Sequence, residues 1–113
     1  MQRRFRLTRS EDFERARRSG KSYANRLVVL VVHENDAGHA RVGVAAGRTV
    51  GNAVKRNRAK RLLRAAMGAL LTSVRPGWDM VLIARPPLAA SNCDEVRAVL
   101  VALLRRAELM PVS

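Results

Sequence analysis

The segment of residues 47–64 contains the residue types that bind phosphate groups. It has seven basic side chains and no acidic one, and it includes the run GNAVKRNRAKRLLR at residues 51–64. A solvated helix surface usually mixes both signs, because like charges this close together repel one another. The unmixed cations therefore predict a polyanionic partner, and a nucleic acid is the expected one. Asn57 adds a neutral donor and acceptor that suits a base edge or a 2′-hydroxyl group.

An amphipathic helix over residues 51–71 is predicted to hold these side chains. At about 100° per residue, one side collects the apolar residues Ala59, Leu62, Leu63, Ala66, Met67 and Leu70. The opposite side collects Asn57, Lys60, Arg61 and Arg64, with Arg56 and Arg58 at its flanks. Asn52 is the predicted N-cap. The free amides and the positive dipole end at this helix start would favour a phosphate.

The positive charge of the chain is concentrated in two segments. The formal net charge is +13 over 113 residues, with +6 in residues 1–26, +7 in residues 47–64 and zero elsewhere. This distribution predicts a localised electropositive surface. No apolar run approaches the ~20 residues that a membrane span needs. The first six residues lack the apolar core of a secretory signal, so a cytoplasmic protein with no membrane partner is expected.

No set of side chains in the sequence forms a recognisable catalytic site. Cys93 is the only cysteine, which excludes an internal disulfide or a cysteine-based zinc site. His33 and His39 lie near a turn with Glu34 and Asp36, but a metal would need a third converging ligand. We therefore expect turn residues there, no metal bound by the protein and no catalysis by this chain alone.

The remaining sequence predicts a small sheet packed by helices. A helix is expected at residues 10–19, with Phe13 as its only large apolar side chain. Phe13 is expected to anchor that helix to the sheet, and a second role as a stacking platform stays open. A last helix, capped by Ser91, has an apolar stripe suited to the core. Short apolar runs predict strands at residues 27–32, 41–46 and 78–84, with one further short strand left open.

Residues 51–64 resemble the signature of the protein subunit of bacterial ribonuclease P, the ribonucleoprotein that removes 5′ leaders from precursor tRNA. That signature is Gly-Asn-Ala-Val, then Arg-Asn-Arg, Lys-Arg and a further Arg, all present in GNAVKRNRAKRLLR. Other segments are similar to further elements of the family: SEDF at 10–13, RSG at 18–20, ANR at 24–26 and IAR at 83–85. Together these matches extend over nearly the whole chain.

The resemblance implies an α+β fold in a single domain over residues 1–113, with a basic arm at residues 1–9. The implied architecture is a small four-stranded sheet packed by helices in the order α-β-β-β-α-β-α. Its β-α-β crossover through the basic helix would be left-handed, as in the ribosomal-protein-S5-domain-2-like fold. General handedness rules predict a right-handed crossover instead.

The resemblance also implies a division of labour between protein and RNA. The ribonuclease P RNA would hold the Mg²⁺ ions and perform the chemistry, and a monomeric protein would bind it in a 1:1 complex. The implied RNA-binding residues are Arg48, Asn52, Lys55, Arg56, Asn57, Arg58, Lys60, Arg61 and Arg64. The 5′ leader of precursor tRNA would lie in a cleft between the first helix and the sheet, with Phe13, Arg17 and Val31 as implied leader-binding residues.

Four positions depart from the family pattern. Arg17 stands where the family often has a second aromatic residue, and Val31 replaces an aromatic residue on the first strand. Arg48 and Thr49 replace the usual Lys-Lys pair. A cleft with fewer aromatic side chains is expected to stack bases less and to depend more on charge.

Charge and fold class alone leave other functions open, because they indicate only that the chain binds a polyanion. A ribosomal or RNA-chaperone protein that binds structured RNA without catalysis is the main alternative, and the run GNAVKRNRAKR separates the two. A DNA-binding helix-turn-helix module is disfavoured by the β-rich remainder of the chain. A membrane-surface helix is disfavoured because the polar face lacks flanking Trp or Phe anchors.

Overall fold

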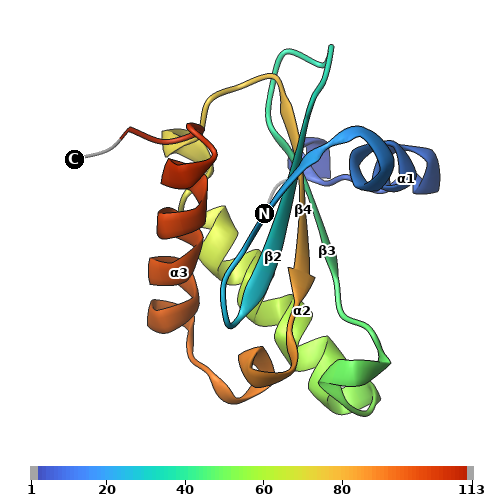
Figure 1. The fold of residues 1–113 in the computed structure, drawn as a ribbon, viewed down its shortest axis with the longest axis vertical. Helices are drawn as coiled ribbons and strands as arrows, with labels where there is room; N and C mark the ends of the chain where they lie inside the picture. The colour runs from blue at the N-terminus through green and yellow to red at the C-terminus, as the bar shows by residue number, and fades with distance from the viewer. Residues whose placement is uncertain (1–2, 112–113) are drawn as a thin grey trace.

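The chain folds into a four-stranded sheet with helices on both faces (Figure 1). The computed structural model describes residues 3–111. The α-helices are α1 (Ser10–Ser19), α2 (Ala53–Gly68) and α3 (Cys93–Arg106). The strands are β1 (Lys21–Ala24), β2 (Val28–Glu34), β3 (Arg41–Ala45) and β4 (Trp78–Ala84). The described 3-10 helices are η1 (Arg3–Phe5), η2 (Arg48–Val50), η3 (Leu71–Ser73) and η4 (Pro86–Ala90).

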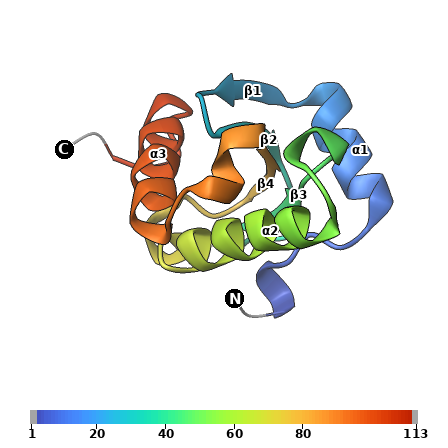
Figure 2. The same ribbon diagram turned by 90° about the horizontal axis from the view of Figure 1, so that it is seen from below.

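The strand order across the sheet is β1-β2-β4-β3, with β3 parallel to β4 and the other neighbours antiparallel. β1 is the further short strand that the sequence pattern left open, so the predicted α-β-β-β-α-β-α order is confirmed. The helix α2 connects the parallel strands β3 and β4 in a left-handed crossover, as Figures 1 and 2 together show. Most crossovers of this kind are right-handed, so this connection is an exception to the general rule.

Alternate side chains of β2 and β4 fill two separate apolar layers. On one face, Leu30, Met80 and Leu82 belong to the main core, which lies beneath α2 and α3. On the other face, Val31 and Val81 lie beneath α1 in a smaller cluster. Figure 2 shows α1 on one side of the sheet and the other two helices opposite. The strand β2 is thus buried on both faces, which explains its uninterrupted apolar sequence.

The ends of the predicted helices differ from the structure in two places. The side chain of Asn92, and not that of Ser91, accepts the hydrogen bond from the Glu95 amide that caps α3 (2.9 Å). Ser91 is buried one residue earlier, so the predicted cap was off by one position. The helix α2 ends at Gly68 instead of residue 71, because Gly68 favours helix poorly and Leu70 bonds three residues back to Met67.

The basic arm covers the outer edge of the sheet. Arg6 pairs with Val42 of β3 in a parallel bridge, and the Leu7 amide donates to the Val42 carbonyl at 2.8 Å. The side chain of Leu7 is buried in the cluster beneath α1. Residues 1 and 2 of the predicted arm lie outside the described residues. By pairing with β3, the arm protects an edge strand that would otherwise present unpaired backbone groups.

Candidate nucleic-acid interface

The start of α2 has the predicted cap. The Asn52 side chain accepts a hydrogen bond from the Lys55 amide at 3.0 Å. Gly51, just before it, has a φ of 138°, a backbone conformation that side chains other than hydrogen rarely permit. Asn52 is exposed, as are Arg48 and Lys55 on either side of it. The helix therefore presents its positive end to solvent with two cations close by in the chain.

The two predicted faces of α2 are present in the structure. Ala59, Leu63, Ala66 and Met67 are buried against the sheet and α3. Asn57, Lys60, Arg61 and Arg64 line a shallow hollow on the opposite side, together with Val54. We call these five residues the outer face of α2. Val54 is 73% exposed and is the one exposed large apolar side chain recorded among residues 3–111.

One of the nine candidate RNA-binding residues, Arg58, has a side-chain hydrogen bond to a distant element of the fold. The Nε of Arg58 donates to the carbonyl of Ala89 at 2.8 Å, which ties α2 to η4. Arg56 is half-buried and follows Asn52 on the first turn of the helix. The sequence could not reveal the Arg58 contact, because the acceptor is a backbone group 31 residues away. Arg58 therefore has a structural role in addition to its charge.

The three residues that the resemblance implies for leader binding differ in how deeply they are buried. Phe13 is half-buried and its ring lies against β3, where a Cβ on Gly43 would overlap it. Glycine at position 43 is thus what permits this close approach. Val31 is only 4% exposed and lies in the cluster beneath α1, so it is part of the core. Arg17 is exposed.

A row of half-buried apolar residues lies on the sheet beside α1. Val29 on β2, Ile83 on β4 and Ala45 on β3 are neighbours in the register of the sheet. Each lies two residues along its strand from a position beneath α1, namely Val31, Val81 or Gly43. Because side chains alternate between the two faces of a sheet, all three share the face of Val31. We call Val29, Ala45 and Ile83 the open strip. The alternation along β2 was the signal for it, since residue 29 shares the face of residue 31.

The helix α1 borders the open strip with two candidate residues. Asp12 faces Arg41 of β3 on one side of the helix. Phe13 and Arg17 are one helical turn apart and therefore lie on the same side of α1, with Phe13 about 100° around the helix axis from Asp12. Phe13 packs in the same cluster as Val29 and Ile83. An apolar floor is therefore flanked by one aromatic ring and one cation.

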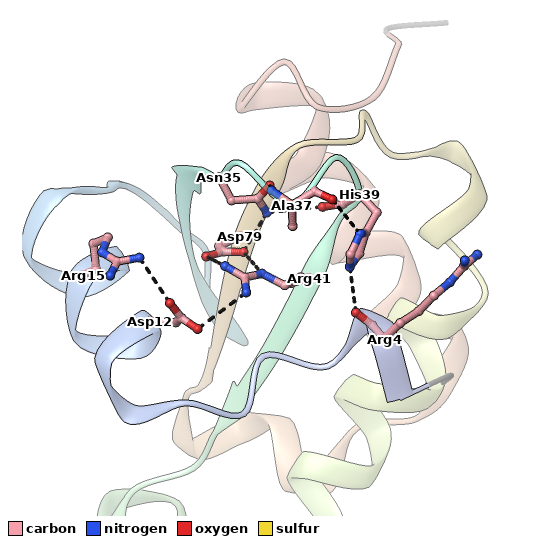
Figure 3. A network of polar contacts seen from close by, with 8 residues as sticks. All are labelled: Arg4, Asp12, Arg15, Asn35, Ala37, His39, Arg41 and Asp79. Atoms are coloured by element: carbon pink, nitrogen blue, oxygen red, sulfur yellow. Dashed lines mark hydrogen bonds and ion pairs between the residues drawn. The ribbon is translucent and has the colours of Figure 1, made fainter.

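The side chain of His39 has a structural role. The two ring nitrogens of His39 lie 3.1 Å from the Ala37 carbonyl and 2.9 Å from the Arg4 carbonyl, so this side chain joins a turn to η1 (Figure 3). Cys93 is exposed at the first position of α3. Between residues 3 and 111, no three His, Cys, Asp or Glu side chains come together in a way that could hold a metal ion. Over the same range, no helix combines the length and apolar character needed to cross a membrane.

Several known proteins are similar to this chain over most of its length. The family model described as Ribonuclease P matches residues 1–108. A ribonuclease P protein component from Oceanobacillus iheyensis is 38% identical over 111 residues, which cover 97% of this chain and 92% of the relative. Another from Dehalococcoides mccartyi is 40% identical over 105 residues, covering 93% and 86% of the two chains.

Solved structures have the same fold. The ribonuclease P protein of Staphylococcus aureus superposes with a TM-score of 0.83 at 29% identity, covering 95% of this chain and 98% of that one. The ribonuclease P protein of Thermotoga maritima gives a TM-score of 0.79 at 30% identity, with coverage of 89% and 96%. The range matched by the family model, residues 1–108, includes α1, α2 and all four strands. The chain belongs to the ribonuclease P protein family.

Proposed function

We propose that this chain is the protein subunit of ribonuclease P and docks on the catalytic RNA through the outer face of α2. The observation that carries the proposal is the absence of any acidic residue from α2 beside its exposed cations. Cations gathered in this way repel one another and destabilise the free helix. An RNA backbone that neutralises them removes that repulsion and releases counterions.

The docking contacts fall into two groups. Lys60, Arg61 and Arg64 would face phosphates, and Asn57 between them would reach a base edge or a 2′-hydroxyl group. The exposed start of α2 forms the second group, in which the free amides of the helix would donate hydrogen bonds to a phosphate. This second group consists of Arg48, Asn52 and Lys55. Arg56 and Arg58 would add charge from the flanks, while Arg58 also holds η4.

The open strip is the surface that we propose for the 5′ leader of precursor tRNA. Single-stranded RNA binds where aromatic rings stack on bases and cations follow the backbone. Phe13 supplies one ring, Arg17 supplies one cation, and Val29 and Ile83 supply an apolar floor. The strand β3 runs from this strip toward η2 and the start of α2 (Figure 1). One RNA-binding surface could therefore extend over both regions.

The RNA partner would supply the reactive site. We propose that it holds most of the Mg²⁺, which polarises the phosphate and stabilises the leaving oxygen in reactions of this type. The cations of this chain would reduce the repulsion between the catalytic RNA and precursor tRNA in a 1:1 complex. The leader contact would favour precursor over mature tRNA, because only the precursor has a leader to bind.

Reconstitution tests this proposal. The purified chain would be mixed with a bacterial ribonuclease P RNA and a 5′-labelled precursor tRNA at low magnesium, where RNA alone has little activity. We expect leader release that requires the protein and is lost in the double variant Arg61→Ala with Arg64→Ala. Arg97→Ala removes a partly exposed charge from α3 and is the control. Tight RNA binding without any gain in cleavage would instead indicate a structural RNA-binding protein.

A further inference from the structure

A polar network centred on Arg41 joins α1 to two strands of the sheet (Figure 3). The Nε and Nη2 of Arg41 donate to the two carboxylate oxygens of Asp79 at 2.8 and 2.9 Å. Its Nη1 lies 3.6 Å from Oδ2 of Asp12 on α1. Asp12 also accepts from Arg15 at 3.2 Å, and Asp79 accepts from Asn35 at 2.8 Å. We call these five residues the Arg41 network.

The charges of this network are unusually protected from solvent. Asp12 and Asp79 are the buried charged residues recorded between residues 3 and 111, with 7% and 2% of their surface exposed. A buried carboxylate is strongly disfavoured unless a cation and hydrogen bonds accompany it. The hydrogen bond to Asp79 raises the pKa of Arg41 above its usual value, so the guanidinium stays charged throughout the working pH range.

The apolar packing beneath α1 is a small cluster. Its buried residues are Leu7, Ala16, Val31 and Val81, with the half-buried Phe13 packed against them, a far smaller set than the main core. Apolar contact is non-directional and permits a short helix to slide or rotate. The Arg41 fork, by contrast, has a fixed planar geometry and reaches across to the first turn of α1. The network therefore adds a directional contact between α1 and β3 to the apolar packing of this helix.

We infer that Arg41 and Asp12 are positioning residues for recognition of a single-stranded RNA leader. Asp12 directly precedes Phe13 in the chain and faces Arg41 of β3, whereas Phe13 packs in the cluster that includes Val29 and Ile83 of the open strip. If its contact with Arg41 is lost, α1 can shift, and Phe13 and Arg17 then move relative to the strip. Neither Arg41 nor Asp12 needs to touch RNA for this effect. The inference rests on the proposed leader contact.

The variant Asp12→Asn weakens the link between α1 and the sheet. It keeps the size of the side chain and removes the charge facing Arg41 and Arg15, while the two bonds between Arg41 and Asp79 remain. Glu11→Gln is the matched control, because it removes the same charge from the neighbouring exposed position. Each protein would be assembled with a bacterial ribonuclease P RNA. The measured quantities are its affinity for that RNA and the holoenzyme's affinities for precursor and mature tRNA.

We expect Asp12→Asn to lower the ratio of precursor to mature affinity by about fivefold or more, since a displacement of about 1 Å is enough for such losses. Its affinity for ribonuclease P RNA and the ratio for Glu11→Gln should equal those of the wild type. An unchanged ratio in Asp12→Asn would overturn the inference. So would a parallel loss of RNA affinity, which would indicate general damage to the fold. If the wild-type holoenzyme itself did not prefer precursor, the leader proposal would be refuted first.

Discussion

Replacing Arg64 with Ala is expected to weaken RNA docking without disturbing the fold. Arg64 is exposed on the outer face of α2, whereas its neighbour Leu63 is fully buried in the main core. No hydrogen bond or ion pair is recorded for Arg64 within residues 3–111. Alanine favours helix, so α2 should keep its structure in the variant.

The size of the effect follows from the number of cations that can reach phosphates. Five cations lie on the outer face and at the start of α2, namely Arg48, Lys55, Lys60, Arg61 and Arg64. At about 0.7–0.9 per phosphate contact, five contacts give a slope of log K against log salt of about −3.5 to −4.5. Arg64→Ala should make that slope shallower by about 0.7–0.9. At about 0.15 M salt, the same contact corresponds to a four- to fivefold loss of affinity.

The assay is a salt titration of binding between the chain and ribonuclease P RNA at fixed magnesium. Arg97→Ala on α3 is the charge-matched control, and the ion pair that it removes with Asp94 is partly exposed and contributes little. We expect the wild-type slope for Arg97→Ala. A wild-type slope for Arg64→Ala would refute the docking face. Equal changes in both variants would mean that overall charge, and not the outer face of α2, determines the affinity.

Three further substitutions test local features of the fold, each by thermal or denaturant unfolding. Arg58→Ala should lower the free energy of unfolding by about 1 kcal/mol through loss of the bond to the Ala89 carbonyl, and no change would show that this contact is unimportant. Glu108→Gly should raise it by about 0.5–1 kcal/mol, because Glu108 has a φ of 61° after α3; a decrease would contradict the assigned strain. Gly43→Ala should lower it by about 1–3 kcal/mol, since the added methyl group overlaps the Phe13 ring; wild-type stability would exclude that overlap.

Much of the fold could be predicted from local patterns in the sequence. The apolar spacing in residues 59–70 placed the buried face of α2 correctly, because a helix repeats every 3.6 residues. Asn52 was predicted as the cap of that helix from its residue type and its place before the periodic segment. The short apolar run of residues 27–32 predicted a strand, and β2 occupies Val28–Glu34. In each case, the signal lies within one element.

The candidate site was predicted less completely, because the burial of each side chain depends on which other elements of the fold cover it. Val31 and Val29 share a face of β2, yet α1 covers residue 31 and leaves residue 29 half-exposed. Nothing in the alternation of the strand distinguishes these two positions. The same holds for Arg58, whose type and place in a basic run suggested a purely external role before its bond to η4 was visible.

The sequence by itself determined that the chain has an amphipathic cationic helix and a small sheet, because 3.6- and 2-residue periods and concentrated charge are local properties. Only the tertiary structure decided how α1 is held. Asp12, Arg41 and Asp79 come from three elements separated by 29 and 38 residues, and each alone looks like an ordinary surface charge. They meet because the crossover through α2 makes β3 and β4 parallel neighbours, with Arg41 in register with Asp79 and α1 packed across the sheet. Such a network depends on strand register and on the packing of α1 across the sheet, neither of which is written in any single segment.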